Sequence, residues 1–131
     1  MPLILRSLLV TTIAASMIAI SASARAHHQP NVYCSESGDL CQSARKVDRV
    51  RKLRIVTAAR YFEVFDLCVY SHREDYECCA PYRLRPRADG TFGRSVAWFK
   101  QWPSMRGPGA FTVTWRVDGT RIGKRLGFHV R

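Results

Sequence analysis

The chain has 131 residues, of which 21 are Lys or Arg and 10 are Asp or Glu, so its formal net charge is +11. Hydrophobic residues make up 47% of the chain, an ordinary globular composition that excludes an intrinsically disordered protein. A chain of this length holds one hydrophobic core, which excludes two-domain enzymes and doubly wound nucleotide-binding folds.

Residues 1–26 are predicted to be a secretory signal peptide. Arg6 precedes an uncharged stretch over residues 7–20, and a tail of small residues ends at Ala26. This stretch is shorter than the roughly 20 residues of a membrane-spanning helix, so a transmembrane anchor is the less favoured interpretation. Cleavage after Ala24 or, as we favour, after Ala26 leaves residues 27–131 as a single secreted domain. Such a domain is extracellular or periplasmic, where disulfides form.

The chain contains five cysteines, which predicts two disulfides and one free thiol. Cys34 and Cys41 enclose a turn-forming Ser-Gly-Asp sequence, so a short loop brings them together. For the second bridge, alternation along two strands places Cys68 and Cys79 on one outer face. A register shift of one residue would select Cys78 instead. The cysteine spacings do not match those of zinc sites.

Strands are predicted over six segments, which are 53–58, 62–70, 79–84, 94–99, 111–117 and 126–130. The clearest is 111–117, where apolar and polar residues alternate strictly and Phe111, Val113, Trp115 and Val117 face the core. Phe65, Leu67 and Phe99 are expected to join them. No helix is predicted beyond a single turn. The pattern predicts an all-β fold, an antiparallel immunoglobulin-like sandwich stapled by disulfides, with a small closed β-barrel as the alternative.

The segment 109–117, followed by a hairpin and residues 126–130, resembles the closing strand pair of bacterial immunoglobulin-like sandwiches. Phe111 stands at the tyrosine-corner position of those domains, but it has no hydroxyl to make the corner hydrogen bond. Together with the Cys34 to Cys41 loop and the segment 66–69, the pattern resembles small secreted proteins that have no assigned activity. The resemblance therefore implies a fold and no particular reaction.

The closing strands also resemble those of the copper-resistance CopC family, in which an Asp-Gly-His hairpin and an N-terminal His bind the metal. Here the hairpin reads Asp118-Gly119-Thr120, so Asp118 matches and Thr120 replaces the imidazole. Signal-peptide cleavage would expose His27 and His28, whose nitrogen atoms suit Cu(II). The resemblance implies an incomplete copper site of His27 and Asp118, and His28 is a further candidate ligand beside His27. The alternative is that both histidines belong to a solvated tail.

Two basic clusters indicate an anionic partner. The first contains Arg45, Lys46, Arg49, Arg51, Lys52 and Arg54, and the second contains Arg83, Arg85 and Arg87. On one strand the three arginines of the second cluster would share a face. A face of this kind attracts an acidic envelope polymer through a salt-sensitive field, whereas specific nucleic-acid binding is not expected outside the cell. The alternative is an ordinary solvated surface.

No pattern typical of catalysis is recognisable in the sequence. A nucleophile with its base, a pair of catalytic carboxylates and a phosphate loop all lack their usual sequence context. Glu74, Asp75 and Glu77 are interpreted as an acidic tip between two strands, and Cys78 as an inward-facing thiol. We therefore expect a protein without enzymatic activity that binds an unknown protein or an acidic polymer at or outside the cell envelope. Nonspecific polyanion binding and copper binding are the alternatives.

Overall fold

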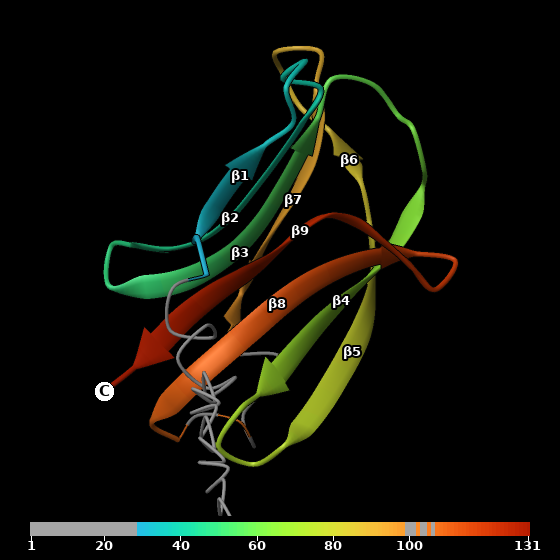
Figure 1. Ribbon diagram of the computed structural model, residues 1–131. Helices are drawn as coiled ribbons and strands as arrows, with labels where there is room; N and C mark the ends of the chain where they lie inside the picture. The colour runs from blue at the N-terminus through green and yellow to red at the C-terminus, as the bar shows by residue number, and fades with distance from the viewer. Residues whose placement is uncertain (1–28, 99–101, 103–104, 106) are drawn as a thin grey trace, which may run out of the picture.

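The structure is a computed structural model that describes residues 29–98, 102, 105 and 107–131. The predicted signal peptide, His27, His28 and Phe99 lie outside these residues. In Figure 1, two open antiparallel sheets lie against each other as layers. The predicted all-β sandwich is confirmed, and the barrel alternative is wrong because neither sheet closes on itself.

Both sheets are built from antiparallel neighbours. The first sheet has the strand order β1 (Val32–Cys34), β2 (Leu40–Val47), β3 (Val50–Thr57), β7 (Phe92–Ala97) and β6 (Arg85–Pro86). The second sheet has the order β5 (Tyr76–Arg83), β4 (Val64–Ser71), β8 (Gly109–Val117) and β9 (Thr120–Val130).

All six predicted strands overlap strands of the structure, but β1, β2 and β6 were not predicted. Strand β2 escaped prediction because its inward positions include Gln42 and Ala44, one polar residue and one small residue. Both are nevertheless fully buried, at 1% and 0% exposure. The basic residues that follow give this strand no apolar alternation, the feature by which a half-buried strand is recognised.

The core lies between the two layers. Of the residues predicted to face it, Phe65, Leu67, Phe111, Val113 and Trp115 are buried, whereas Val117 is only half buried. Each buried side chain of this size contributes about 1.5–3 kcal/mol to stability. An aromatic cluster closes one part of this core, with ring centroids 5.0–5.3 Å apart, and consists of Trp98, Phe111 and Phe128.

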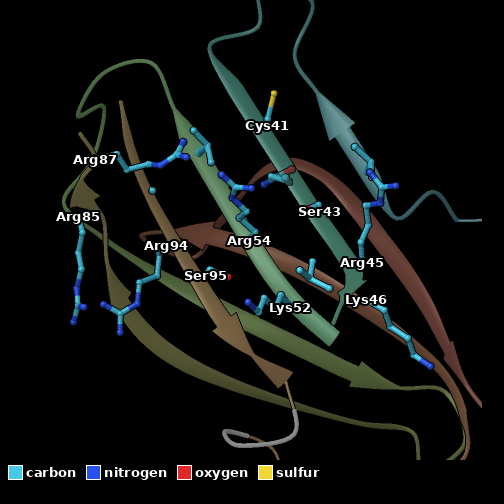
Figure 2. A pocket seen from close by; sticks show the side chains of 15 residues that line it. Cys41, Ser43, Arg45, Lys46, Lys52, Arg54, Arg85, Arg87, Arg94 and Ser95 are labelled. Atoms are coloured by element: carbon cyan, nitrogen blue, oxygen red, sulfur yellow. The ribbon is translucent and has the colours of Figure 1, made fainter. Parts of the chain in front are cut away.

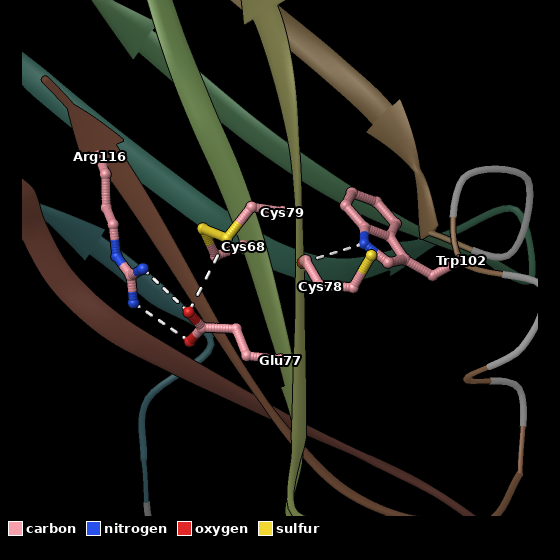
Figure 3. A network of polar contacts seen from close by, with 6 residues as sticks. All are labelled: Cys68, Glu77, Cys78, Cys79, Trp102 and Arg116. Carbon is pink, nitrogen blue, oxygen red and sulfur yellow. Dashed lines mark hydrogen bonds and ion pairs between the residues drawn. A yellow bond between two sulfur atoms is a disulfide. The ribbon is translucent and has the colours of Figure 1, made fainter. Parts of the chain in front are cut away.

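The end of the sandwich beside β5 is closed by Trp102, which is 2% exposed. Its indole Nε1 donates a hydrogen bond to the backbone carbonyl of Cys78, at 3.2 Å. Cys78 itself is half buried, and its thiol is free, as predicted (Figure 3). Pro81 lies on the same edge strand and offers no N–H. Trp102 and Pro81 therefore protect β5 against pairing with another chain.

Two disulfides join neighbouring strands. Cys34 pairs with Cys41, and Cys68 pairs with Cys79 at directly opposed positions of β4 and β5. The structure thus has the pair that strand alternation favours. Disulfides indicate an oxidising compartment outside the cytoplasm. Among the described residues, no helix is long and apolar enough to cross a membrane.

Glu77 does not belong to an acidic tip, so that prediction is wrong for this residue. It lies within β5, and its carboxylate accepts two hydrogen bonds from the guanidinium of Arg116, at 2.9 and 3.1 Å. Figure 3 shows this ion pair beside the Cys68–Cys79 bridge. The ion pair ties β5 to β8 across the outer face of the second sheet.

Candidate anion-binding groove

The outer face of the first sheet forms an open groove of about 980 Å³. Its floor and walls come from β1, β2, β3, β6 and β7 (Figure 2). The cations that line it are Arg45, Lys46, Lys52, Arg54, Arg85, Arg87 and Arg94. No Asp or Glu is among the described residues that line the groove. The groove therefore presents one sign of charge.

Strand register arranges the outward side chains of the groove in rows that cross the sheet. One row pairs Ser43 with Arg54 and Arg54 with Ser95. A second row pairs Cys41 with Val56, which lies opposite Gly93. Neighbouring strands are about 4.8 Å apart, so each row places one residue per strand at that interval. In the row of Ser43, Arg54 and Ser95, an arginine on β3 therefore stands between two serines on the neighbouring strands.

A third row places like charges directly opposite each other. Arg45 on β2 faces Lys52 on β3. Like charges at opposed positions of a sheet destabilise it. Among the described residues, no carboxylate lies within 4.0 Å of Arg45, Lys46 or Lys52 to offset the repulsion. The fold therefore carries a concentration of positive charge that its own acidic residues do not neutralise.

Arg87 reaches the groove from the loop that follows β6. Its stem passes over Gly93 on β7, where an added Cβ would lie 3.1 Å from the Arg87 Cδ and 2.9 Å from a backbone oxygen of β3. A side chain at position 93 would therefore displace Arg87. Thr91 accepts a hydrogen bond from the Arg87 guanidinium, and Asp89 lies 3.7 Å from it.

The loop around Arg87 is fixed by its own hydrogen bonds. The Asp89 carboxylate accepts hydrogen bonds from the backbone N–H and the hydroxyl of Thr91, and these bonds lower the pKa of Asp89. The backbone N–H of Arg87 donates to the carbonyl of Thr91, at 2.8 Å. The loop thus holds Arg87 in place before any ligand arrives.

The structure brings together six of the nine basic residues predicted to bind an anion. These are Arg45, Lys46, Lys52, Arg54, Arg85 and Arg87. Arg94, Ser43 and Ser95 also line the groove but were not predicted. Ser43 and Ser95 became recognisable only through the register across strands. Arg94 stands alone between Gly93 and Ser95, outside both basic clusters, and its cation lies over the ring of Tyr82, at 5.3 Å.

The other three predicted residues do not line the groove. Arg49 occupies the turn between β2 and β3 with a φ of 67°. Arg51 turns to the opposite face, where its guanidinium lies over the ring of Phe128 and donates to the carbonyl of Ala44. Burial lowers the pKa of Arg51. Its role is therefore packing between the sheets.

Arg83 is separated from Arg85 by a crossing of the chain between the two layers. Arg83 ends β5 in the second sheet and forms an exposed ion pair with Glu63, at 3.0 Å. Leu84 is buried at the crossing, and Arg85 begins β6 in the first sheet. The expectation that Arg83, Arg85 and Arg87 share one strand face is therefore wrong.

Of the three residues implied as copper ligands, only Asp118 is among the described residues. It lies in the turn between β8 and β9 with a φ of 50°. Gln29 is the first described residue, and its side chain accepts a hydrogen bond from Thr112, near the other end of β8. Thr112 and Asp118 are six residue steps apart along the strand, which is about 20 Å. Copper binding stays a prediction.

Among the described residues, one cluster has the composition of a metal site. It consists of Cys68, Glu77 and Cys79, whose ligand atoms lie within 4.8 Å of one another. The two sulfur atoms are joined in a disulfide, and the Glu77 carboxylate is bound by Arg116. All three groups are therefore already bonded to other groups of the protein.

Comparisons with known proteins give no relative. No family model matches the chain, and no curated protein or solved structure is significantly similar to it.

Proposed function

We propose that this protein is a secreted, non-catalytic, immunoglobulin-like binding module whose groove on the first sheet takes an acidic polymer of the cell envelope. The predicted signal peptide and the two disulfides support export. The sandwich supplies a rigid support, and the groove is open along the sheet surface, which suits an extended chain better than a small enclosed ligand.

The observation that carries this proposal is the direct opposition of Arg45 and Lys52 within a groove lined by seven cations. Two cations at opposed positions cost stability unless an anion lies between them. A polyanion offers repeated charges at intervals comparable to the strand spacing, and its binding releases counterions. The groove thereby gains affinity from an arrangement that is unfavourable in the free protein.

The test measures the affinity of the exported protein for polyglutamate and for polyphosphate at low and moderate salt. We expect the double variant K52Q/R54Q to bind both polymers at least ~10-fold more weakly and with a shallower salt dependence. The matched control is R121Q/R125Q, which removes the same charge from exposed positions of β9 in the second sheet. This control is expected to lose less than about twofold.

Equal weakening by the two double variants would show that net charge alone drives binding, and it would contradict a site in the groove. Absence of saturable binding to either polymer at low salt would contradict the proposal altogether. Binding to one envelope component that persists at moderate salt would identify that component as the partner.

A further inference from the structure

We infer that the centre of the groove recognises a phosphomonoester, such as a terminal phosphate on a sugar of the polymer, through Arg54, Arg87, Ser43 and Ser95. This inference rests on the proposed function and deepens it, because it names the charged group that the groove selects. It depends on how donors are arranged at one place, not on the overall charge.

One row of outward side chains crosses β2, β3 and β7 at the centre of the groove. Ser43 and Ser95 flank Arg54 on the same face of the sheet. Within the described part of the chain, the side chains of Ser43, Arg54 and Ser95 make no hydrogen bond or ion pair. Their donors are therefore available to a ligand lying on the sheet.

Arg87 approaches this row from the edge of the sheet. Figure 2 shows its side chain extending from the edge of the sheet across β7 toward β3, the strand that carries Arg54. Gly93 leaves the space for this path, since an added Cβ would lie 3.1 Å from the Arg87 Cδ. Two guanidinium groups on different elements thus approach the same part of the groove.

The number of hydrogen-bond donors in this part of the groove distinguishes between the possible anions. Arg54 offers two parallel N–H donors, Arg87 keeps Nε and Nη2 as donors while its Nη1 donates to Thr91, and the two hydroxyls offer one donor each. A carboxylate has about four lone-pair positions and one charge, so it cannot accept from all of these donors. A phosphomonoester has three free oxygens and a charge near −2 at neutral pH, so it accepts more hydrogen bonds than a carboxylate and is attracted more strongly to the seven cations of the groove. A sulfate ester matches the oxygens but carries only one charge.

The experiment uses three ligands built on one sugar, which are glucose 6-phosphate, glucose 6-sulfate and glucuronate. Their affinities for the exported protein are measured by calorimetry at pH 7.5 and pH 5.0. We expect glucose 6-phosphate to bind about tenfold more tightly than glucuronate at pH 7.5. Its affinity should fall several-fold at pH 5.0, because the second phosphate pKa is about 6. Glucose 6-sulfate should show no such change.

The protein does not supply this pH dependence. Histidine, the side chain that ordinarily titrates in this range, is absent from the described residues that line the groove. The charged groups facing Arg54 and Arg87 are Arg45 and Lys46 on β2, Lys52 on β3, Arg85 on β6, Arg94 on β7 and Asp89 in the loop. Hydrogen bonds from Thr91 lower the pKa of Asp89, which keeps this carboxylate ionised at pH 5.0.

Two sets of variants locate the selectivity. R87Q and the double variant S43A/S95A should each reduce the preference for glucose 6-phosphate over glucuronate to less than about threefold. R45Q, which removes one cation from another row of the same groove, should weaken all ligands in proportion and keep the preference. All three variants alter residues that line the groove, and none of these residues belongs to the core.

Equal affinity for glucuronate and glucose 6-phosphate, or a glucose 6-phosphate affinity that does not change with pH, would overturn this inference. Loss of the preference in R45Q as well would overturn the assignment to these four residues. The proposed function would survive either result if K52Q/R54Q still lost polymer binding. Absence of polymer binding would instead remove the proposed function itself.

Discussion

The side-chain amide of Gln42 on β2 fills the space next to Gly123 on β9. Its Nε2 donates to the carbonyl of Ile122, at 3.1 Å, and its Oε1 accepts from the backbone N–H of Lys124, at 3.2 Å. Strand β9 bulges at this point, where its register against β8 shifts between Val113 and Trp115. One buried amide thus replaces the hydrogen bonds that the bulge takes away from the ladder.

We predict that Q42L destabilises the protein by about 2–3 kcal/mol, because leucine keeps the volume but leaves a buried N–H and a buried carbonyl without partners. Urea unfolding, followed by tryptophan fluorescence, measures the loss. A change below about 0.5 kcal/mol would mean that water or another group replaces the amide.

A second prediction concerns Gly123, on the other side of the contact with Gln42. G123A puts a Cβ into clashing distance of the Gln42 amide, at a residue with a φ of 66°. G119A has a similar φ of 79° but meets nothing within 4 Å. Left-handed backbone strain affects both variants, about 1 kcal/mol each. G123A should therefore unfold at lower urea concentration than G119A, and equal midpoints would refute the contact.

We predict that T114V stabilises the protein by about 1 kcal/mol. The Thr114 hydroxyl is buried and has no hydrogen-bond partner among the described residues. Valine has the same shape and no polar group. The matched control is T112V on the same strand, because the Thr112 hydroxyl donates to Gln29 and therefore accepts from the Nε2–H of His72. T112V should destabilise by about 1–2 kcal/mol, and a loss in T114V would contradict the assignment.

We predict that C79S leaves Cys68 as a free thiol and does not produce a bridge to Cys78. Side chains of adjacent residues in a strand point to opposite faces, so Cys78 points toward the core while Cys68 faces outward. Loss of the bridge should cost about 2–4 kcal/mol. Alkylation of the unfolded, unreduced protein followed by mass spectrometry counts the free thiols.

C78S is the control for the cysteine prediction and should retain both disulfides with no free thiol. Two alkylated cysteines are expected in C79S. A peptide containing a Cys68–Cys78 bridge in C79S would show that β5 can shift its register by one residue.

For the copper prediction, the expected outcome is one Cu(II) bound per exported chain and loss of that ion in H27A. The physical reason is that an N-terminal amine and an imidazole on the first residue chelate Cu(II). Metal analysis after dialysis measures the stoichiometry, and intact mass establishes whether His27 is the first residue. D118N is the matched test of the hairpin carboxylate. Unchanged copper in H27A would contradict the prediction.

The core and the Cys68–Cys79 bridge could be predicted because they depend on alternation along strands, and the Cys34–Cys41 bridge because a short turn joins its cysteines. Phe111, Val113 and Trp115 are buried because strict alternation forces one face of β8 inward. The same rule separates Cys79 from Cys78. Strand β2 could not be predicted, because Gln42 is buried where it hydrogen-bonds to the bulge of β9. These strands are far apart in the sequence, and no local pattern indicates this contact.

The sequence could predict a basic surface, but it could not predict which basic side chains line the groove. Arg51 and Lys52 are neighbours in the chain, yet one packs on Phe128 and the other lines the groove, because adjacent residues point to opposite faces. Arg83 and Arg85 belong to different layers because the chain crosses at Leu84. Ser43 and Ser95 become neighbours of Arg54 only through the pairing register, which depends on the whole sheet.

The opposed cations of β2 and β3 make the stability of the molecule responsive to its surroundings. Any anion that settles between Arg45 and Lys52 relieves their repulsion, so the melting temperature should rise in order of anion affinity. A thermal-shift survey of envelope extracts and defined saccharides would therefore rank unlabelled ligands directly. The melting temperature of the protein thus reports ligand binding without a label.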